Sequence, residues 1–336
     1  MQGIKIIGTG CYIPDKVVTN EDFTKIIDTT SEWIASRTGI EERRFSHDKL
    51  NFRMSAIAAE EALKSANVNA EEIDFIIFSS CSPDFFYPAT ACLIQKCIGA
   101  KNAACIDINS ACTGFINGLD MARAYIVANG YKKVLIVAGE YLSRILDFED
   151  RGSCFLFGDG AGAVLVEAAD KPFYSVIGAD GDIFKALYGK IQYHTTNPFV
   201  TAEEYTAEDE IKQYFETERK NEYLQMDGKA VYRFAVDAMS NSVKDVCKKA
   251  GCELSDLDLI VPHQANKRII QASMKALGVD ESKVYINIEK RGNTSSVCIP
   301  TCLDELFKAG KIKEGMKICL VGFGAGLTYG AIIFDV

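Results

Sequence analysis

This sequence has few basic residues relative to acidic ones: 37 lysine and arginine residues against 46 aspartate and glutamate residues. The formal net charge at pH 7 is therefore -9. Proteins that bind nucleic acid generally neutralise its phosphates with a basic surface, so this charge balance weighs against a general nucleic-acid-binding protein. An acidic partner would have to bind on a local basic patch.

The sequence also lacks a long apolar run. No stretch reaches the roughly 20 apolar residues that a membrane-spanning helix needs, and residues 1–8 do not resemble a signal peptide. We therefore expect a cytoplasmic protein with no membrane partner. Hydrophobic residues make up 48% of the 336 residues, which is enough for two core-forming units of a globular protein.

No CxxC pair occurs among the 12 cysteines. Cysteine pairs at that spacing are typical of zinc knuckles, and disulfide frameworks are typical of secreted proteins. The sequence therefore predicts reduced thiols and no metal site.

One of these thiols, Cys112, lies in a turn of small residues between a strand expected at 103–108 and an apolar helix that ends at Gly130. Unpaired amides and the positive end of the helix dipole favour a thiolate at such a position, and a thiolate attacks carbonyl carbons. We interpret Cys112 as a nucleophile. The alternative is a buried structural cysteine, which is the commoner role of a free cysteine.

Histidine is scarce, so few residues could act as a base beside Cys112. His47 lies in a charged loop and His194 in a segment of poor periodicity, and both positions are typical of the surface. His263 instead follows an apolar strand expected at 257–262 and precedes a helix, so the strand can hold it at the edge of a cleft. A packed, hydrogen-bonded histidine is the alternative.

An internal repeat is visible in the sequence. Residues 66–76 align without gaps with residues 250–260, an offset of 184 positions. Residues 134–139 align with residues 317–322 at an offset of 183 positions. Two matches at nearly the same offset indicate a duplicated chain.

The duplication predicts two halves, residues 1–170 and residues 171–336, in which strands alternate with helices. We expect each half to form a mixed sheet layered with helices, and a pseudo-twofold axis to relate the two. The offset places the small, polar turn at 291–296 opposite Cys112, so two helix starts would face each other.

Two further kinds of segment indicate no site by themselves. The charged run at 41–44, which follows Trp33 and Arg37, is typical of a solvated helix end. The glycine-rich segments 157–162 and 322–330 lack both the GxGxxG spacing and a following Lys-Ser/Thr pair, so they do not predict nucleotide binding. Tight turns fit them better.

Together, these motifs resemble the β-ketoacyl-acyl carrier protein synthase III family of condensing enzymes, in the thiolase superfamily. The matching segments span nearly the whole chain and are 31–40, 109–115, 150–152 with 157–162, 262–266, 292–295 and 322–330. The resemblance implies an α/β, duplicated thiolase-like fold with five αβαβα layers, and a homodimer. It also implies a catalytic triad of Cys112, His263 and Asn293.

For function, the resemblance implies an acyltransferase that starts fatty acid synthesis. A short acyl-CoA such as acetyl-CoA would acylate Cys112, and malonyl-acyl carrier protein would then condense with the acyl group as it loses CO2. Neutral His263 and Asn293 would stabilise the enolate, and the amides of Cys112 and Ala325 would form the oxyanion hole. The family commonly has glycine where Ala325 stands. No cofactor is expected besides these substrates.

The remaining roles also come only from the resemblance. The residues expected to bind coenzyme A are Thr29, Trp33, Arg37, Arg151 and Asn266. The residues expected to dock the carrier protein are Arg233, Lys267 and Arg268. Tyr87, in the aromatic loop 85–88, would line the acyl pocket of the partner subunit. Lys229 stands where the family commonly has asparagine, and the stretch 182–224 is longer than usual and predicts a lid-like insertion.

Other interpretations stay open. A related condensing or acyl-transfer enzyme of secondary metabolism, which would use an unusual acyl-CoA, is the main alternative. A non-catalytic partner subunit of the same fold is disfavoured because Cys112, His263 and Asn293 are all present. A papain-like protease is disfavoured by the duplication and by the lack of a CGSCW-type segment.

Overall fold

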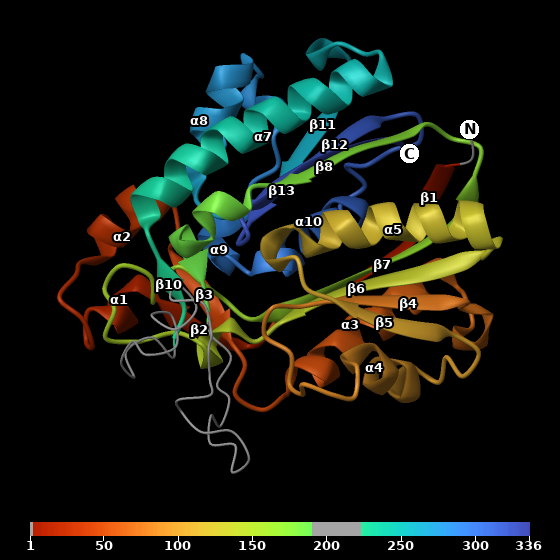
Figure 1. Cartoon of the computed structure of the whole chain (residues 1–336). Helices are drawn as coiled ribbons and strands as arrows, with labels where there is room; N and C mark the ends of the chain where they lie inside the picture. The colour runs from red at the N-terminus through yellow and green to blue at the C-terminus, as the bar shows by residue number, and fades with distance from the viewer. Residues whose placement is uncertain (1–2, 190–222) are drawn as a thin grey trace, which may run out of the picture.

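The computed structural model describes residues 3–189 and 223–336. Most of the insertion expected at 182–224 therefore lies outside the described residues, and its lid-like role stays a prediction. The described residues form layers of helices and sheets that are stacked one above another (Figure 1). The α/β class expected from the sequence is confirmed.

The first sheet contains five strands in the order β1-β7-β6-β4-β5. β4 is parallel to both β5 and β6, whereas β7 is antiparallel to β6 and β1. All of β4 is buried, as is usual for parallel strands that are covered on both faces. The strands are Gly3–Tyr12 (β1), Phe75–Ser79 (β4), Ala104–Ile108 (β5), Lys133–Glu140 (β6) and Gly160–Ala169 (β7).

The second sheet contains four strands in the order β11-β12-β13-β8. β11 and β12 are parallel, and the other two pairs are antiparallel. This arrangement repeats β4-β6-β7-β1 of the first sheet, and the segments that align in the sequence repeat include parts of β4 with β11 and of β6 with β12. The strands are Phe173–Ala179 (β8), Leu259–Pro262 (β11), Lys317–Gly324 (β12) and Thr328–Asp335 (β13).

Helices form three further layers. α5 and α10 lie between the sheets, α3 and α4 cover the outer face of the first sheet, and α7 and α8 cover the outer face of the second (Figure 1). Apolar residues of α5 such as Phe115 and Leu119 belong to a core that includes strands of both sheets, so burial of this helix joins the two halves. The helices are Asn51–Ala66 (α3), Thr90–Ile98 (α4), Gly114–Asn129 (α5), Gly228–Ala250 (α7), Lys267–Leu277 (α8) and Cys298–Lys308 (α10).

Shorter elements gather at one end of the layers. They are Lys16–Thr19 (β2), Asn20–Phe23 (α1), Ser31–Thr38 (α2), Glu42–Phe45 (β3), Leu187–Tyr188 (β9), Gln225–Met226 (β10) and Ile288–Arg291 (α9). β2 pairs with β3, and β9 pairs with β10.

Residues 42–44 of the charged run are not a solvated helix end, as the sequence suggested, but part of β3 with Arg43 fully buried. The guanidinium of Arg43 donates to the carbonyl oxygen of Phe155 at 2.6 Å and to Oδ1 of Asn20 at 3.0 Å, and it lies over the ring of Phe23. Burial lowers the pKa of Arg43 to about 10. The charge is tolerated in the interior because carbonyl and amide oxygens accept hydrogen bonds from the guanidinium group.

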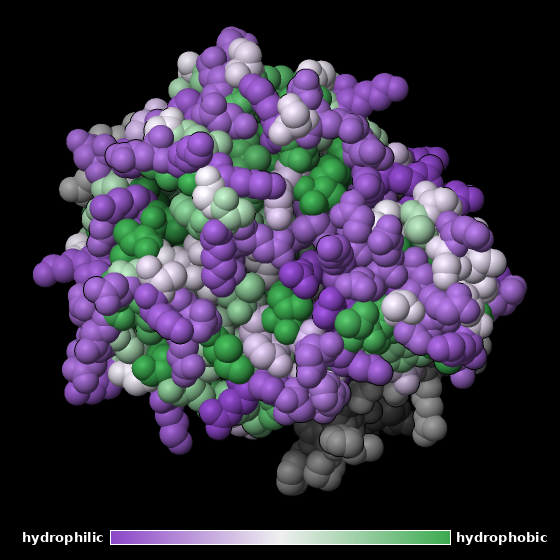
Figure 2. Space-filling view, turned by 180° about the vertical axis from the view of Figure 1, so that it is seen from behind, coloured by the Kyte–Doolittle hydropathy of each residue, from purple (hydrophilic) through white to green (hydrophobic). Residues whose placement is uncertain are grey.

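The face opposite that of Figure 1 is mostly polar, with apolar residues in small separate groups (Figure 2). Within residues 3–189 and 223–336, no helix combines the length and the apolar composition needed to cross a membrane. In the same part of the chain, no cluster of three or more His, Cys, Asp or Glu side chains is arranged to hold a metal ion.

Candidate active site

A cavity of about 750 Å³ lies between the two halves of the chain. Cys112, His263 and Asn293 all line it. Cys112 lies in a short 3-10 turn, Ala111–Thr113, directly before α5, while His263 follows β11 and Asn293 lies just beyond α9. The turns after strands and before helices therefore bring together the three residues that the resemblance implies as a triad.

Cys112 is buried, with 7% of its surface exposed. α5 begins at Gly114, so the sulfur belongs to the turn before the helix rather than to its first turn. Burial raises the pKa of Cys112 to about 12, although hydrogen bonds from the Ser295 hydroxyl and from its own backbone act in the opposite direction. Burial therefore opposes the thiolate that the helix start was expected to favour.

His263 is buried, yet both of its ring nitrogens lack a hydrogen-bond partner among the described residues. Its amide donates to the carbonyl oxygen of Val321 at 2.8 Å, and its ring packs edge to face on Phe323 with centroids 5.6 Å apart. Burial lowers the pKa of His263 to about 3, so the ring is neutral at physiological pH. A neutral imidazole carries one N–H that can donate to a substrate oxygen.

Asn293 is held so that the nitrogen of its side-chain carboxamide can act as a donor. Its Oδ1 accepts a hydrogen bond from the amide of Ser295 at 2.8 Å. Its backbone amide donates to Leu156, and its carbonyl oxygen accepts from the amide of Gly158. Because the side-chain oxygen is already engaged, the NH2 group of Asn293 is the part of the carboxamide left for a ligand.

The turn after β12 lies against Cys112. The Thr113 hydroxyl donates to Oγ1 of Thr328 at 2.9 Å, which ties the cysteine turn to the start of β13. Ala325 and Cys112 line a second cavity of about 440 Å³. This placement is compatible with an oxyanion hole made by the amides of Cys112 and Ala325, which stays a prediction.

Three of the five residues expected to bind coenzyme A line the larger cavity: Trp33, Arg37 and Asn266. The guanidinium groups of Arg37 and Arg151 each lie 5.9 Å from the centre of the Trp33 ring. The side-chain amide of Asn266 donates to the carbonyl oxygen of Arg37 at 3.1 Å, so α2 and α8 are joined at this point. Such an aromatic and cationic surface suits a planar base with phosphates.

The other two residues of that set lie outside the cavity lining. Arg151 is exposed and pairs with Asp28 at 3.3 Å. The hydroxyl of Thr29 is buried and has no hydrogen-bond partner among the described residues. Their predicted part in coenzyme A binding is therefore not supported by the cavity lining, and it stays a prediction.

The basic residues expected to dock the carrier protein differ in their surroundings. Arg233 and Arg268 are exposed and line the larger cavity, as does Lys229. Lys267 instead forms an ion pair with Glu289 at 2.8 Å. Within residues 3–189 and 223–336, Arg233, Arg268 and Lys229 form no ion pair, so they supply the positive charge at this rim rather than Lys267.

The aromatic loop at 85–88 does not reach either cavity of its own chain. Tyr87 is 83% exposed and Phe86 is 68% exposed. An exposed aromatic group of this size is typical of an interface, so the predicted role of Tyr87 in the acyl pocket requires a second copy of the chain.

The structure adds residues that the sequence did not single out. Ser295 and Glu140 act on the pKa of Cys112, as does the thiol of Cys298, and Cys81 lines the smaller cavity. The internal repeat predicted that the turn at 291–296, which contains Ser295, lies opposite Cys112. No sequence signal marked Glu140, because it is simply the last residue of an apolar strand.

Comparisons with known proteins identify relatives of this chain. The family model described as 3-oxoacyl-[acyl-carrier-protein (ACP)] synthase III matches residues 106–181, and the model of its C-terminal part matches residues 247–336. A β-ketoacyl-[acyl-carrier-protein] synthase III from Clostridium acetobutylicum is 46% identical, over 99% of this chain and 98% of the relative.

Solved structures give the same result. The 3-oxoacyl-[acyl-carrier-protein] synthase III of Aquifex aeolicus VF5 is 38% identical with a TM-score of 0.89, over 99% of this chain and 100% of that one. The priming β-ketosynthase of the R1128 polyketide biosynthetic pathway is 34% identical with a TM-score of 0.88, over 99% of this chain and 96% of that one.

These likenesses extend over the whole length and confirm the duplicated thiolase-like fold expected from the sequence. They also cover the segments that carry Cys112, His263 and Asn293. The chain therefore belongs to the β-ketoacyl-[acyl-carrier-protein] synthase III family and is a condensing acyltransferase.

Proposed function

We propose that this enzyme starts fatty acid synthesis by condensing a short acyl-CoA, in the first instance acetyl-CoA, with malonyl-acyl carrier protein. One observation carries the proposal: a buried thiol, a neutral imidazole without a partner among the described residues, and a fixed carboxamide share one cavity. These are the groups that acyl transfer followed by decarboxylation needs.

In the first half-reaction the sulfur of Cys112 attacks the carbonyl carbon of the acyl-CoA thioester. The new C–S bond forms as the bond to the coenzyme A sulfur breaks, and the thiol proton of Cys112 ends on that sulfur. The amides of Cys112 and Ala325 would stabilise the oxyanion between these events. Burial lowers the pKa of His263, which disfavours uptake of this proton by its ring, so acylation should depend on His263 less than condensation does.

In the second half-reaction the malonyl group loses CO2, and the electron pair of the broken C–C bond forms an enolate. The enolate oxygen accepts hydrogen bonds from the N–H of His263 and from the NH2 group of Asn293. The enolate carbon attacks the acyl carbon, the C–S bond to Cys112 breaks, and the sulfur takes up one proton. That proton is the one that decarboxylative condensation consumes.

Binding of the two substrates uses different surfaces. Trp33, Arg37 and Asn266 would hold the nucleotide part of the acyl-CoA, with Thr29 and Arg151 at the edge. Arg233 and Arg268 would dock an acidic acyl carrier protein, with Lys267 acting mainly through its ion pair to Glu289. The net charge of -9 leaves such a local patch as the means of binding an anionic partner.

The same proposal includes a homodimer in the cytoplasm and no resident cofactor. Exposed Tyr87 and its neighbours supply the apolar surface for the second copy.

A second candidate is a priming enzyme of secondary metabolism that takes an unusual acyl-CoA. The likeness to the R1128 priming β-ketosynthase favours it, because that protein is about as similar in fold as the fatty acid relatives. Phe184, Leu187 and Leu224 line the smaller cavity with apolar side chains.

Intact mass spectrometry separates the candidates. The enzyme is incubated with a panel of acyl-CoAs, and malonyl-acyl carrier protein or malonyl-CoA is then added. Rapid labelling by acetyl-CoA and release by the malonyl carrier support the proposal. Labelling only by longer or branched acyl-CoAs, or release only by malonyl-CoA, would support the second candidate instead.

A further inference from the structure

Glu305, in α10, receives hydrogen bonds from three side chains of the segment 285–291. Its Oε1 accepts from Nε of Arg291 at 3.2 Å and from Nη2 of the same side chain at 2.9 Å. Its Oε2 accepts from the hydroxyl of Tyr285 at 2.9 Å and from the side-chain amide of Asn287 at 2.9 Å. Glu305 therefore acts as an acceptor on both carboxylate oxygens.

Arg291 connects this carboxylate to Asn293. Arg291 is the last residue of α9, and Gly292 alone separates it from Asn293. Gly292 has a φ of +63°, and a Cβ atom at that position would lie 2.9 Å from the carbonyl oxygen of Leu156. The turn is tight, with no room to rearrange. A displacement of the end of α9 is therefore passed on to the turn that carries Asn293.

Asn287 connects the same carboxylate to the segment around His263. The backbone amide of Asn287 donates to Oε1 of Gln264 at 3.1 Å. Gln264 is fully buried, and its side-chain nitrogen donates to the carbonyl oxygens of Pro262 at 2.8 Å and of Tyr285 at 3.1 Å. Pro262 and Gln264, on either side of His263, are thereby joined to the segment that Asn287 belongs to.

The groups proposed for acylation are held by other contacts. Thr113 and Thr328 tie the cysteine turn to the start of β13. Gly324, at the end of β12, packs against the amide of Cys112. A change at Glu305 should therefore displace the donors for condensation and leave the oxyanion hole in place.

We propose that Glu305 is a positioning residue for condensation, which sets the separation of His263 and Asn293. It acts through Asn287 on one side and through Arg291 on the other. The inference rests on the proposed function, in which the two donors bind one enolate oxygen. Each donor must lie about 3 Å from that oxygen, and a displacement near 1 Å costs about 10- to 100-fold in rate.

Glu305→Gln tests this inference, because a carboxamide has one acceptor end and one donor end. It cannot accept from Arg291 at one end and from Tyr285 and Asn287 at the other, so one of the two connections is lost. Single-turnover condensation by pre-acetylated enzyme should slow by about 10-fold. Acetylation of Cys112 by acetyl-CoA should stay nearly unchanged. An unchanged condensation rate in a folded variant, or an equal loss in both steps, overturns the proposal.

The Glu305→Gln variant is expected to fold. The side chains of Arg291 and Glu305 are 26% and 25% exposed, so water can reach the groups that lose their partners. On its other side, α9 keeps the ion pair of Glu289 with Lys267 and the hydrogen bond from the amide of Glu41 to the carbonyl oxygen of Glu289. Loss of the carboxylate should therefore shift α9 rather than unfold it.

The dependence on carrier concentration separates positioning from substrate binding. In Glu305→Gln, the condensation rate at saturating malonyl-acyl carrier protein should fall. The carrier concentration that gives half of that rate should stay near the wild-type value, because Glu305 is not part of the proposed docking surface. A wild-type rate at saturation with a weaker apparent affinity would assign Glu305 to binding and overturn the proposal.

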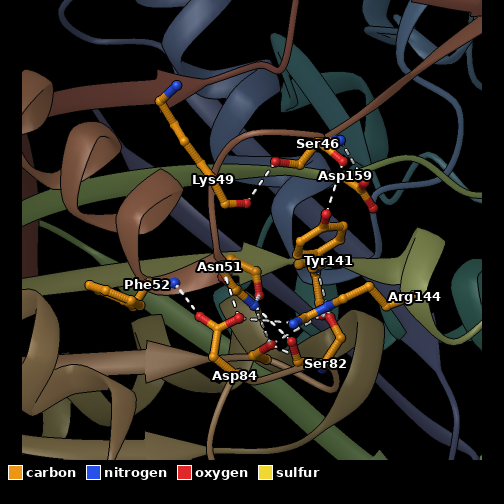
Figure 3. A network of polar contacts seen from close by, with 12 residues as sticks. Ser46, Lys49, Asn51, Phe52, Ser82, Asp84, Tyr141, Arg144 and Asp159 are labelled. Atoms are coloured by element: carbon orange, nitrogen blue, oxygen red, sulfur yellow. Dashed lines mark hydrogen bonds and ion pairs between the residues drawn. The ribbon is translucent and has the colours of Figure 1, made fainter. Parts of the chain in front are cut away.

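A matched control is the ion pair of Asp84 with Arg144, at 2.9 Å, which Figure 3 shows. Asp84 also accepts from the backbone amides of Asn51 and Phe52 at the start of α3, and its side chain is only 2% exposed. Asp84→Asn breaks this more buried pair, yet it should leave condensation by pre-acetylated enzyme unchanged. If it slows condensation as much as Glu305→Gln does, the effect is general loosening and the proposal is wrong.

A double-mutant cycle tests the connection through Arg291. Arg291→Met removes the guanidinium group, keeps an apolar stem and should itself slow condensation. Glu305→Gln should then slow condensation less in that background than in the wild type. An equal slowing in both backgrounds would show that Glu305 does not act through Arg291, against the proposal.

A variant that fails to fold does not end the test. If Glu305→Gln is not folded, Arg291→Met alone should slow condensation and spare acetylation, and wild-type condensation by folded Arg291→Met would overturn the proposal. Acetylation and condensation by the wild type, measured in parallel, test the proposed function separately. A wild type that does not condense with malonyl-acyl carrier protein contradicts that function, whereas an active wild type with an unaffected Glu305→Gln variant contradicts only this inference.

Discussion

Gly324 packs directly against Cys112. A Cβ atom added at position 324 would lie 2.8 Å from the amide nitrogen of Cys112 and 3.2 Å from its Cβ. The end of β12 can approach the nucleophile this closely only because residue 324 has no side chain. The proposed oxyanion hole, which uses the amides of Cys112 and Ala325, depends on that approach.

Gly324→Ala should therefore slow the transfer of an acetyl group to Cys112. The added methyl would push the amide of Cys112 away from its position, and displacements near 1 Å cost about 10- to 100-fold in rate. Rapid-quench mass spectrometry measures the rate. Gly181→Ala is the control, since no atom of the described residues lies within 4 Å of a Cβ atom at that position. Similar rates for the two variants would count against a close-packed oxyanion hole.

His263→Ala and Asn293→Ala should keep most of the acylation of Cys112 and lose the condensation step. Acylation returns the thiol proton to coenzyme A and should depend less on His263, whose pKa is lowered by burial, whereas the enolate needs both donors. The loss should be at least about 100-fold for each variant, as for other oxyanion donors. Single-turnover assays with pre-acylated enzyme separate the steps, and normal condensation by either variant would contradict the assigned roles.

Burial of neutral His263 should make the fold sensitive to acid. The pKa of His263 is about 3 in the folded chain and near 6.5 in the unfolded chain, so the unfolded chain binds more protons between these values. Stability contributed by this residue is therefore present above pH 6.5 and is lost as the pH falls. Between pH 6.5 and 5.0 the loss is about 1.5 kcal/mol.

Urea denaturation at the two pH values measures this loss. A His263→Gln variant should lose about 1.5 kcal/mol less than the wild type over the same interval. His47→Gln, which alters a side chain that is 58% exposed, should behave as the wild type does. Equal acid sensitivity of wild type and His263→Gln would mean that His263 is not buried neutral.

Arg268→Glu should raise the KM for malonyl-acyl carrier protein severalfold while leaving acylation by acetyl-CoA nearly unchanged. Charge reversal at an exposed rim replaces attraction by repulsion for an acidic partner, and the effect should weaken as salt is added. Lys275→Glu makes the same charge change in the last turn of the same helix, away from the cavity. An equal KM increase for both variants would indicate a general charge effect rather than a docking site.

Much of the fold could be predicted because the apolar periodicity and the internal repeat are visible in the sequence itself. The strand before Cys112 and the helix after it are where the apolar pattern placed them. The arrangement of β11, β12, β13 and β8 repeats that of four strands in the first half, as the sequence alignment of the halves indicated. Motifs in a fixed order then identified the family before any geometry was known.

The features that the sequence did not provide depend on contacts between distant segments. Arg43 looked solvated because its neighbours are charged, but acceptors from residues as far away as Phe155 bury it. The helix that follows Cys112 favours a thiolate, and this helix is visible in the sequence. The burial that raises the pKa of Cys112 depends on both halves of the chain and is not. Glu140 lies at the end of an apolar strand, and nothing near it in the sequence indicates that the hydroxyls of Ser82 and Ser296 donate to it.

The central claim is that Cys112 carries the acyl group, and peptide mapping after incubation with acetyl-CoA tests it most directly. The wild type should gain one acetyl group on the Cys112 peptide, and Cys92→Ala, which alters an exposed thiol, should gain the same group. Cys112→Ala should gain none. Acetylation of Cys112→Ala at the wild-type rate, or an acetyl group on Cys81 or Cys298 in the wild type, would contradict the account.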